Sequence, residues 1–306
     1  MHERKNAYQM AADSLIAQLE SGTVPWRKPW ASGGMPRNLV SRREYRGMNA
    51  FALLMAQRSS PYWLTFKQAL DLGGNVMKGE KGTYICKYSV YDRKNKNEET
   101  GEEGSSRSGY LKTYCVFNLT QCNPELAVKL GVNQPAAPVE DLPAAQAIWD
   151  SYSNRPELRD SNKAYYRHSD DSIGMPPRAA FPEQREYYST LFHEMVHSTG
   201  ATKRLDREGI TKPEKSFGDV DYSQEELVAE FGASMLCAVT GIQPAVVQNS
   251  AAYIKAWLDV LKASDNKKAL TQAVSAAQKA CDHIRTTQAE TPQPEPAAVE
   301  EELVAV

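Results

Sequence analysis

Residues 191–200 read LFHEMVHSTG, and this stretch decides how the second half of the chain is expected to fold. Its His-Glu-x-x-His core separates His193 from His197 by four positions. On an α-helix both imidazoles therefore leave the same face, one turn apart, as chelation of a metal ion requires. Glu194 projects at a neighbouring angle, from which its carboxylate can take a proton from an attacking water. The stretch predicts a helical metal site with hydrolytic chemistry.

The residues around the motif favour a helix. Phe181-Pro182-Glu183 is typical of a helix start, and Gly200 supplies a stop. The alternative is a pair of helical histidines that make only structural hydrogen bonds. The metal interpretation is favoured because three fixed residues, two of them histidine, arise by chance in about one in a hundred chains of this length. Apolar residues recur at helical spacing beside the histidines, at Tyr187, Tyr188, Leu191 and Met195.

A catalytic zinc ion usually has three protein ligands and a water, so the motif lacks one ligand. Candidates lie in a second helical segment, which is predicted to begin at Ser223. Glu226 and Glu230 share a face, so one can bind the metal while the other orients a histidine. Spacing alone does not rank them, although Glu226 is preferred. Ser223 and Glu226 also fit a capping box, in which Glu226 would only complete the helix start, and Glu225 is expected to face solvent.

The composition describes a chain large enough for two domains. It has 306 residues with 41% hydrophobic content, which can bury a sizeable core. No apolar run approaches the length of a membrane span, and residues 1–6 lead into no signal peptide. The protein is therefore expected to be cytoplasmic. Its five cysteines are scattered without a C-x-x-C pair, which predicts reduced thiols and neither a disulfide framework nor a zinc knuckle.

The charges are divided unevenly along the chain. Residues 1–135 hold 19 Lys or Arg and 12 Asp or Glu, a net of +7, and the remainder holds 17 and 26, a net of −9. A basic module joined to an acidic one favours a polyanion as the partner of the first, and nucleic acid is the commonest polyanion. An ordinary solvated surface is the alternative that charge alone leaves open.

Aromatic residues alternate with the cations of the basic half. Unpaired bases stack on flat rings while Lys and Arg follow the phosphates, so this mixture is typical of single-strand binding. Taken singly, each tryptophan is more often a core residue, and no recognition helix for duplex DNA is evident. The candidate DNA-binding residues are Trp26, Arg27, Lys28, Trp30, Tyr45, Arg46, Trp63, Lys67, Lys78 and Lys81.

Strand and helix patterns place both halves in the α+β class. Residues 83–92 and 111–118 alternate like strands, and the polar insert 93–109 between them predicts a hairpin with a long tip. In the second half, residues 163–167 and 171–176 resemble short strands ahead of the motif helix. An edge strand beside a metal helix can pair with an extended polypeptide.

A Pro/Ala-rich run near the middle divides the chain. It predicts a nucleic-acid-binding domain at residues 1–135, a linker at 136–143 and a metal-bearing domain at 144–285. Residues 286–306 are rich in Pro, Ala and Glu without a basic residue, which predicts a disordered tail. The predicted fold class is therefore α+β, with two domains.

Both halves resemble the ArdC-type antirestriction proteins carried on conjugative plasmids. In the first half the resemblance rests on GTVPWRKPW at 22–30, YRGMN at 45–49, WLTFKQ at 63–68, KGEKG at 78–82 and VFN at 116–118. In the second half it rests on DSIGMP at 171–176, HEMVHSTG at 193–200, Arg204-Leu205 and EELVAE at 225–230. The resemblance implies an N-terminal single-stranded-DNA-binding domain and a C-terminal zincin-like metallopeptidase domain. It also implies protection of incoming plasmid DNA from host restriction.

The predicted chemistry is metal-dependent peptide hydrolysis. Zinc is the expected ion for two imidazoles and one carboxylate, with manganese or another divalent ion as the alternative. Glu194 would act as general base and then pass the proton to the leaving amine. The developing negative charge would be stabilised by Tyr222 or by a tyrosine of the Tyr187–Tyr188 pair.

Three functions are compatible with these motifs. The first is a DNA-tethered metallopeptidase that cuts an unidentified protein, for example a component of a restriction system. The second is a non-enzymatic shield that covers single-stranded DNA and whose metal site is structural. The third is a decoy whose acidic surface engages a restriction enzyme. The intact Glu194 favours the first interpretation.

Overall fold

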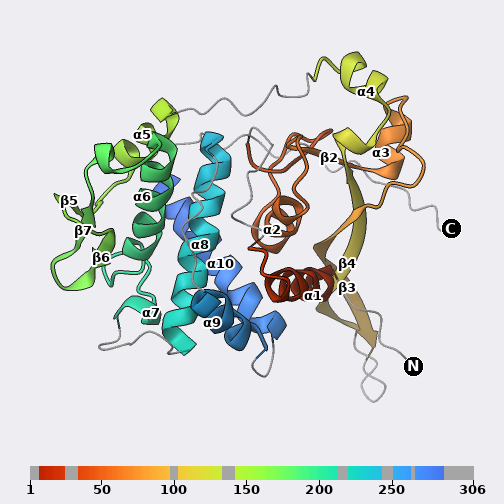
Figure 1. Cartoon of the computed structure of the whole chain (residues 1–306). Coiled ribbons are helices and arrows are strands. Elements are labelled where there is room, and N and C mark those ends of the chain that lie inside the picture. The colour runs from red at the N-terminus through yellow and green to blue at the C-terminus, as the bar shows by residue number, and fades with distance from the viewer. Residues whose placement is uncertain are drawn as a thin grey trace.

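The computed structural model describes residues 7–24, 34–96, 103–132, 142–211, 220–242, 251–262 and 266–285. The predicted α+β class with two domains is confirmed, and Figure 1 shows a sheet at each side of the molecule with helices between them. Within these ranges, no helix combines the length and the apolar character that crossing a membrane requires. The helices are α1 (Ala7–Glu20), α2 (Gly47–Met55), α3 (Phe66–Asp71), α4 (Pro124–Lys129), α5 (Leu142–Ser151), α6 (Gln184–Ser198), α7 (Glu208–Thr211), α8 (Val220–Thr240), α9 (Ala251–Lys262) and α10 (Asn266–Arg285). The strands are β1 (Arg37–Asn38), β2 (Tyr62–Thr65), β3 (Thr83–Lys96), β4 (Glu103–Asn118), β5 (Glu157–Asp160), β6 (Tyr165–Arg167) and β7 (Ser172–Met175).

The first sheet has four strands in the order β1-β2-β4-β3. β1 is parallel to β2, and β4 is antiparallel to both β2 and β3. The predicted hairpin of β3 and β4 is confirmed, but its strands are longer than predicted, because pairing continues from Asp92–Arg107 to Lys96–Glu103. Ladder hydrogen bonds come from the backbone, so this polar stretch pairs without the apolar alternation that sequence patterns detect.

Side-chain alternation along β2 gives this sheet two packed faces. Trp63 points to one face, where it packs with Leu53 of α2. Leu64 points to the other face, where it packs with Ala69 of α3 and Leu126 of α4. Successive residues of a strand lie on opposite faces, so both neighbours are buried although they belong to different cores.

The second sheet has three strands in the order β5-β7-β6 and lies against α6. β5 is parallel to β7, and β6 is antiparallel to β7. The two strands predicted ahead of the motif helix are confirmed as β6 and β7. β5 was not predicted, because its residues Glu157–Asp160 are mostly exposed and charged and carry no alternating pattern. β6 forms an edge of this sheet next to the motif helix.

The largest core joins helices from both halves of the chain. It includes residues of α1 and α2 together with residues of α6, α8 and α10, and the rings of Phe51 and Phe231 meet with centroids 4.6 Å apart. Residues 136–143, the predicted linker, lie almost entirely outside the described residues, as do the predicted tail and residues 97–102 at the hairpin tip. The exact division between the domains therefore stays a prediction.

The helices α6 and α8 approach each other closely. A Cβ atom at Gly232 of α8 would lie 2.6 Å from the Val196 side chain of α6, so only glycine fits at this crossing. α8 begins at Val220, one turn before the predicted start at Ser223. Ser223 therefore does not cap the helix, and the capping-box role considered for Glu226 is wrong. The carboxylate of Glu226 is free to face α6.

Candidate metal centre

The helix α6 carries the His-Glu-x-x-His motif on the face that packs against α8. Its first residues follow the extended backbone of Glu183, and the motif falls in its last turns. His197 and Glu194 are each 8% exposed, and the His193 side chain is 21% exposed. The histidines are T-shaped, with ring centroids 4.7 Å apart. The predicted helix and its shared histidine face are therefore present.

The potential ligand atoms of His193, His197 and Glu226 lie close together and are called the ligand triangle below. The Nε2 atoms of His193 and His197 are 3.1 Å apart. Oε2 of Glu226 lies 3.5 Å from Nε2 of His193, and its Oε1 lies 3.4 Å from Nε2 of His197. Ligands about 2.0–2.1 Å from a tetrahedral ion lie about 3.3 Å from one another. The triangle thus has the size that a tetrahedral divalent ion requires, and the donors are two imidazoles and a carboxylate.

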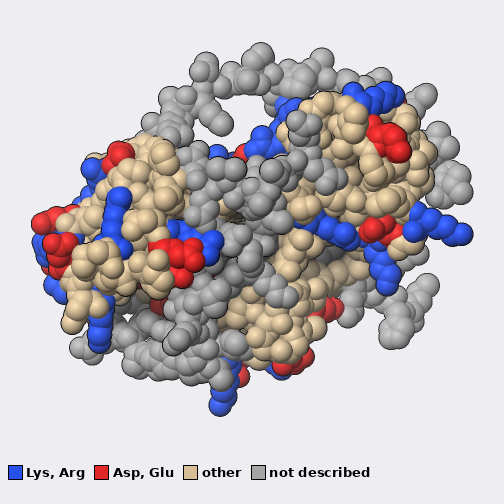
Figure 2. Space-filling view, turned by 45° about the horizontal axis from the view of Figure 1, so that its top comes forward, with Lys and Arg blue, Asp and Glu red and all other residues tan. Residues whose placement is uncertain are grey.

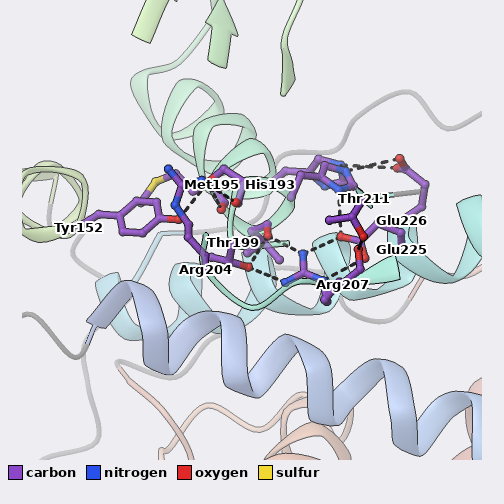
Figure 3. Close-up of polar contacts among 12 residues, drawn as sticks. Tyr152, His193, Met195, Thr199, Arg204, Arg207, Thr211, Glu225 and Glu226 are labelled. Carbon is purple, nitrogen blue, oxygen red and sulfur yellow. Dashed lines mark hydrogen bonds and ion pairs between the residues drawn. The ribbon is translucent and has the colours of Figure 1, made fainter. Parts of the chain in front are cut away.

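The two glutamates that spacing left unranked lie at different places. Glu226 faces both Nε2 atoms, as described above and shown in Figure 3. Glu230, one turn later on α8, places its carboxylate 3.8 Å from Nδ1 of His193. Glu226 is therefore positioned to bind an ion, and Glu230 to orient the histidine through its other nitrogen.

Glu225 was predicted to face solvent, and this prediction is wrong. It is 5% exposed, and its Oε1 lies 3.4 Å from Nδ1 of His197. Arg207 holds the same carboxylate with two donors, at 3.0 Å from Oε2 and 2.6 Å from Oε1. The buried carboxylate is stable because Arg207 and His197 both compensate its charge. Glu225 thereby fixes the ring of His197 with Nε2 directed at the triangle.

Arg207 is itself tied to the end of α6. Its guanidinium donates to Oγ1 of Thr199 at 2.6 Å and to the carbonyl of Val196 at 2.8 Å. Figure 3 shows the side chain between Glu225 and Thr199, with Thr211 beside it. The contact between Arg207 and Glu225 was not predicted, because Arg207 belongs to the loop after α6 and no local pattern places a loop residue against α8.

A second buried ion pair joins the loop to the sheet. The Arg204 guanidinium, with a side chain 1% exposed, binds both carboxylate oxygens of Asp171 at 2.7 and 2.9 Å. Tyr166 of β6 donates to the same carboxylate at 2.9 Å. Arg204 also donates to the carbonyl of Ser198 at 3.0 Å. The network links the end of the metal helix to the turn between β6 and β7 and so fixes the edge strand.

The edge strand and the motif enclose one cavity of about 320 Å³. The backbone of Tyr166 acts to lower the pKa of Glu194 through a hydrogen bond, against the larger effect of burial. The remaining walls come from α6, α7 and α8, and the cavity is lined by Ala164, Tyr165, Tyr166, His193, Glu194, His197, Gly209, Ile210, Glu225 and Glu226. A polypeptide laid along β6 would therefore pass beside the ligand triangle and the Glu194 carboxylate.

Burial and close charges shift the pKa values of these groups. Burial raises the pKa of Glu194, against the opposing effect of the histidines, which makes its carboxylate a stronger base. Burial acts to lower the pKa of His197, but Glu225 and Glu226 outweigh it and raise the value to about 10. Burial acts to raise the pKa of Glu226, but contact with His193 and His197 outweighs it and lowers the value well below its usual range.

The tyrosines proposed to stabilise negative charge lie elsewhere. Tyr187 and Tyr188 are buried, and the Tyr188 hydroxyl donates to Gln146 of α5 at 3.0 Å. Their rings face Arg178 instead of the cavity, so this prediction is wrong for both. The side chain of Tyr222 lies outside the described residues. Tyr165 and Tyr166 line the cavity in their place, and their position on a strand just before the motif was the available signal.

The predicted DNA-binding residues differ in their exposure and contacts in the structure. Trp63 is 1% exposed, so its role as a stacking surface is wrong, because β2 turns the indole into the core. Arg46 pairs with Asp282 of α10, and Tyr45 is half-buried beside Asn38. The side chains of Lys67, Lys78 and Lys81 are exposed. Trp26, Arg27, Lys28 and Trp30 lie outside the described residues.

Two family models match the chain. Residues 5–117 match the N-terminal domain of the anti-restriction factor ArdC, and residues 144–277 match a zincin-like metallopeptidase domain. The two matches cover the basic half and the motif-bearing half, in that order.

Solved structures and relatives resemble the chain over most of its length. The metal-free crystal structure of the antirestriction protein ArdC from plasmid R388 is 38% identical with a TM-score of 0.71, and covers 92% of this chain and 97% of its own. The Mn(II)-bound structure of that protein is 35% identical with a TM-score of 0.69, and covers 93% and 99%. The uncharacterized protein y4eC of Sinorhizobium fredii is 30% identical and covers 92% of both chains. A DNA primase TraC of Escherichia coli is 32% identical over 93% of this chain, which spans only 20% of the primase.

Proposed function

The chain belongs to the ArdC family of antirestriction proteins, and on this premise we propose that it is a DNA-tethered metallopeptidase. Its N-terminal half binds single-stranded DNA, and its C-terminal half hydrolyses a protein that meets that DNA, such as a restriction component. The combined action protects plasmid DNA that enters a host by conjugation. One observation carries the peptidase assignment: the ligand triangle, the buried Glu194 and the edge strand β6 share one cavity.

The residues assigned to the metal are His193, His197 and Glu226. A divalent ion bound there would supply Lewis acidity toward a water and a peptide carbonyl. The Mn(II)-bound structure of the R388 relative supports a divalent ion, and zinc is the ion that this donor set favours. Glu225 and Glu230 hold the Nδ1 sides of the two histidines, so that both Nε2 atoms stay directed at one point.

Glu194 is the general base of the proposed reaction. Its carboxylate is buried at the cavity wall, where it can accept the proton of the attacking water and deliver it to the leaving amine. The edge of β6 orients the substrate, because an extended peptide can add to an exposed strand edge through its backbone. The Asp171–Arg204 pair keeps that edge in register with Glu194 through Tyr166.

The test uses Glu194→Gln in the full chain, with Glu186→Gln on the same helix as the matched control. Plasmid DNA is transferred into restricting recipient cells, and the surviving fraction is measured with each variant. Glu194→Gln is expected to bind Mn²⁺ and single-stranded DNA like the wild type but to lose protection, since removal of a general base costs about 10²- to 10⁴-fold in rate. Glu186→Gln is expected to protect normally.

Normal protection by Glu194→Gln would contradict a peptidase function. The single-strand shield would then be the better explanation, because it needs the fold and the DNA-binding surface but no proton transfer. Metal content measured on the same preparations separates a lost general base from a lost ion.

A further inference from the structure

A group of partly exposed aromatic rings lies on the N-terminal sheet, on different elements from the metal centre. Phe66, the first residue of α3, is 51% exposed, and Tyr84 of β3 is 43% exposed. Phe117 of β4 is half-buried, and its ring centroid lies 6.4 Å from that of Phe66, edge to face. Large rings that stay in contact with water in one patch indicate a surface for a partner.

Strand pairing places these rings on one face of the sheet. Tyr84 is the register partner of Cys115. Cys115 and Phe117 share a face because side chains alternate along a strand. A Cβ atom at Gly82 would lie 2.3 Å from Sγ of Cys115 and 3.1 Å from the Phe117 ring, so glycine at this position leaves room for both side chains on this face. Phe66, Tyr84 and Phe117 are called the aromatic face below.

Three exposed lysines belong to the segments that carry the aromatic face. Lys67 follows Phe66 on α3, and Lys78 and Lys81 belong to the loop that ends at Gly82. All three are exposed, and among the described residues none of the three pairs with a carboxylate. In Figure 2 Lys and Arg side chains project at the right of the molecule, with some Asp and Glu among them, on the side where Figure 1 shows α3, α4 and the long hairpin.

The one acidic residue of this loop, Glu80, contacts residues other than the lysines. Glu80 accepts a hydrogen bond from Nε2 of Gln121 at 2.7 Å and pairs with Arg58 at 3.4 Å. The same Gln121 nitrogen donates to the carbonyl of Lys81 at 2.8 Å, and Gln121 is fully buried. The buried Gln121 therefore fixes the loop, Arg58 compensates the charge of Glu80, and the lysines of the loop remain exposed.

We propose that the aromatic face is the base-stacking platform for single-stranded DNA, with Lys67, Lys78 and Lys81 along the phosphates. The inference rests on the proposed single-strand binding and names the surface that performs it. Flat rings bordered by unpaired cations suit a strand whose bases are apolar on both faces and whose backbone is anionic. Three motifs distant in sequence, WLTFKQ, KGEKG and VFN, meet at this surface.

The charge pattern favours a nucleic acid over a polypeptide as the occupant. An apolar peptide would gain from aliphatic surface as much as from rings, and it would not need three unpaired ammonium groups. Leu70, one turn after Phe66 on α3, is also 51% exposed and provides the comparison. Base stacking requires the ring of Phe66 and does not depend on the side chain of Leu70.

The test measures binding of a labelled oligothymidylate of about 16 nucleotides, the upper range of single-strand site sizes, by fluorescence anisotropy with the full chain. Phe66→Ala and Phe117→Ala are expected to raise Kd about 5- to 150-fold each, the range found for loss of one stacked base. Phe66→Trp should bind like the wild type, Phe66→Leu should bind like Phe66→Ala, and Leu70→Ala should be unchanged. Lys67→Gln and Lys81→Gln should each reduce the slope of log K against log salt by about 0.7.

An abasic strand of the same length isolates the stacking contribution. Wild type and Phe66→Ala are expected to bind it equally, because it has phosphates but no bases. Failure of the wild type to bind either strand would contradict the proposed DNA function and this inference together. Binding by the wild type that Phe66→Ala and Phe117→Ala leave unchanged would overturn the aromatic face alone. Equal losses in Phe66→Ala and Leu70→Ala, with Phe66→Leu normal, would overturn stacking and indicate an apolar polypeptide site.

Discussion

The metal centre and the aromatic face differ in whether their charged side chains are buried and paired. Around the metal centre, the carboxylates of Glu225, Glu226 and Glu230 lie 3.4–3.8 Å from histidine nitrogens, and the side chains of Glu225, Arg207 and His197 are 6–12% exposed. On the aromatic face, the lysines are exposed and unpaired among the described residues. The first arrangement fixes the positions of the ligand atoms, and the second suits the proposed binding of a long anionic polymer, which requires no single fixed contact.

This difference predicts different sensitivities. Buried networks lose several kcal/mol when one partner is removed, because a charge is left without compensation. Exposed cations contribute through counterion release, so their effect depends on salt and is spread over several residues. Substitutions at the metal centre should therefore act individually and steeply, and those on the aromatic face should act gradually and with salt.

The largest expected effect is on the free energy of unfolding, and it distinguishes a core residue of the N-terminal half from a residue of the aromatic face. Trp63→Ala should lower the free energy of unfolding by about 3–5 kcal/mol, because it removes a fully buried ring and leaves a cavity. Phe66→Ala, three residues later, should change it by less than about 1 kcal/mol, because half of that ring is in water. Urea denaturation followed by circular dichroism measures both.

Single-strand binding should show the reverse order. Folded Trp63→Ala protein should bind oligothymidylate like the wild type, whereas Phe66→Ala should not. The distinction between core and surface would not hold if Trp63→Ala left stability unchanged and abolished DNA binding in folded protein.

Three substitutions on α8 test which glutamate binds the metal ion and which glutamates orient the histidines. Glu226→Gln should lower the affinity for Mn²⁺ by more than about 100-fold, because it removes a ligand. Glu225→Gln should lower it by about 10- to 100-fold, the usual effect of a group that orients a ligand. Glu230→Gln should have the smallest effect, because its carboxylate lies 3.8 Å from His193. Isothermal titration with Mn²⁺ gives the three values.

Each variant replaces a carboxylate by an amide of equal size on one helix, so the series is internally matched. Oligothymidylate binding serves as the control for folding and should be unchanged throughout. A larger loss in Glu230→Gln than in Glu226→Gln would reverse the assignment and make Glu230 the ligand.

Local spacing accounts for what the sequence predicted. The shared face of His193 and His197 depends only on helix geometry, so it follows from four positions of sequence. The β3–β4 hairpin and the strands β6 and β7 follow from alternation within a few residues. These features need no knowledge of what packs against them.

The wrong predictions concern residues whose burial is determined by packing between segments distant in sequence. Glu225 is buried because Arg207 reaches it from a loop 18 positions away, and no periodicity encodes that approach. Trp63 was predicted to stack on bases and Phe66 was not considered, although the strand ends at Thr65 and a helix begins at Phe66. The capping box between Thr65 and Gln68 was the signal that the side-chain alternation ends there.

The smallest expected effect concerns the buried pair that anchors the edge strand. Contacts with Arg204, Lys203 and Tyr166 outweigh the effect of burial and hold the pKa of Asp171 well below its usual range. A depressed pKa in the folded state stabilises the protein above the unfolded value of about 3.9 and loses that contribution as pH falls through the folded value. Asp171→Asn should therefore lower the free energy of unfolding by about 1–3 kcal/mol at neutral pH.

The difference between wild type and Asp171→Asn should be constant at neutral pH and should shrink as the pH falls below about 4, because protonation removes the same charge from the wild type. Urea titrations between neutral and acidic pH measure this convergence. Asp170→Asn is the neighbouring control, since Asp170 is paired at the surface with Arg159 and Arg167 and exposed pairs contribute little. A difference that stayed constant into acid would show that Asp171 stabilises the turn by its shape and hydrogen bonds, and that the edge strand does not depend on the charge of this pair.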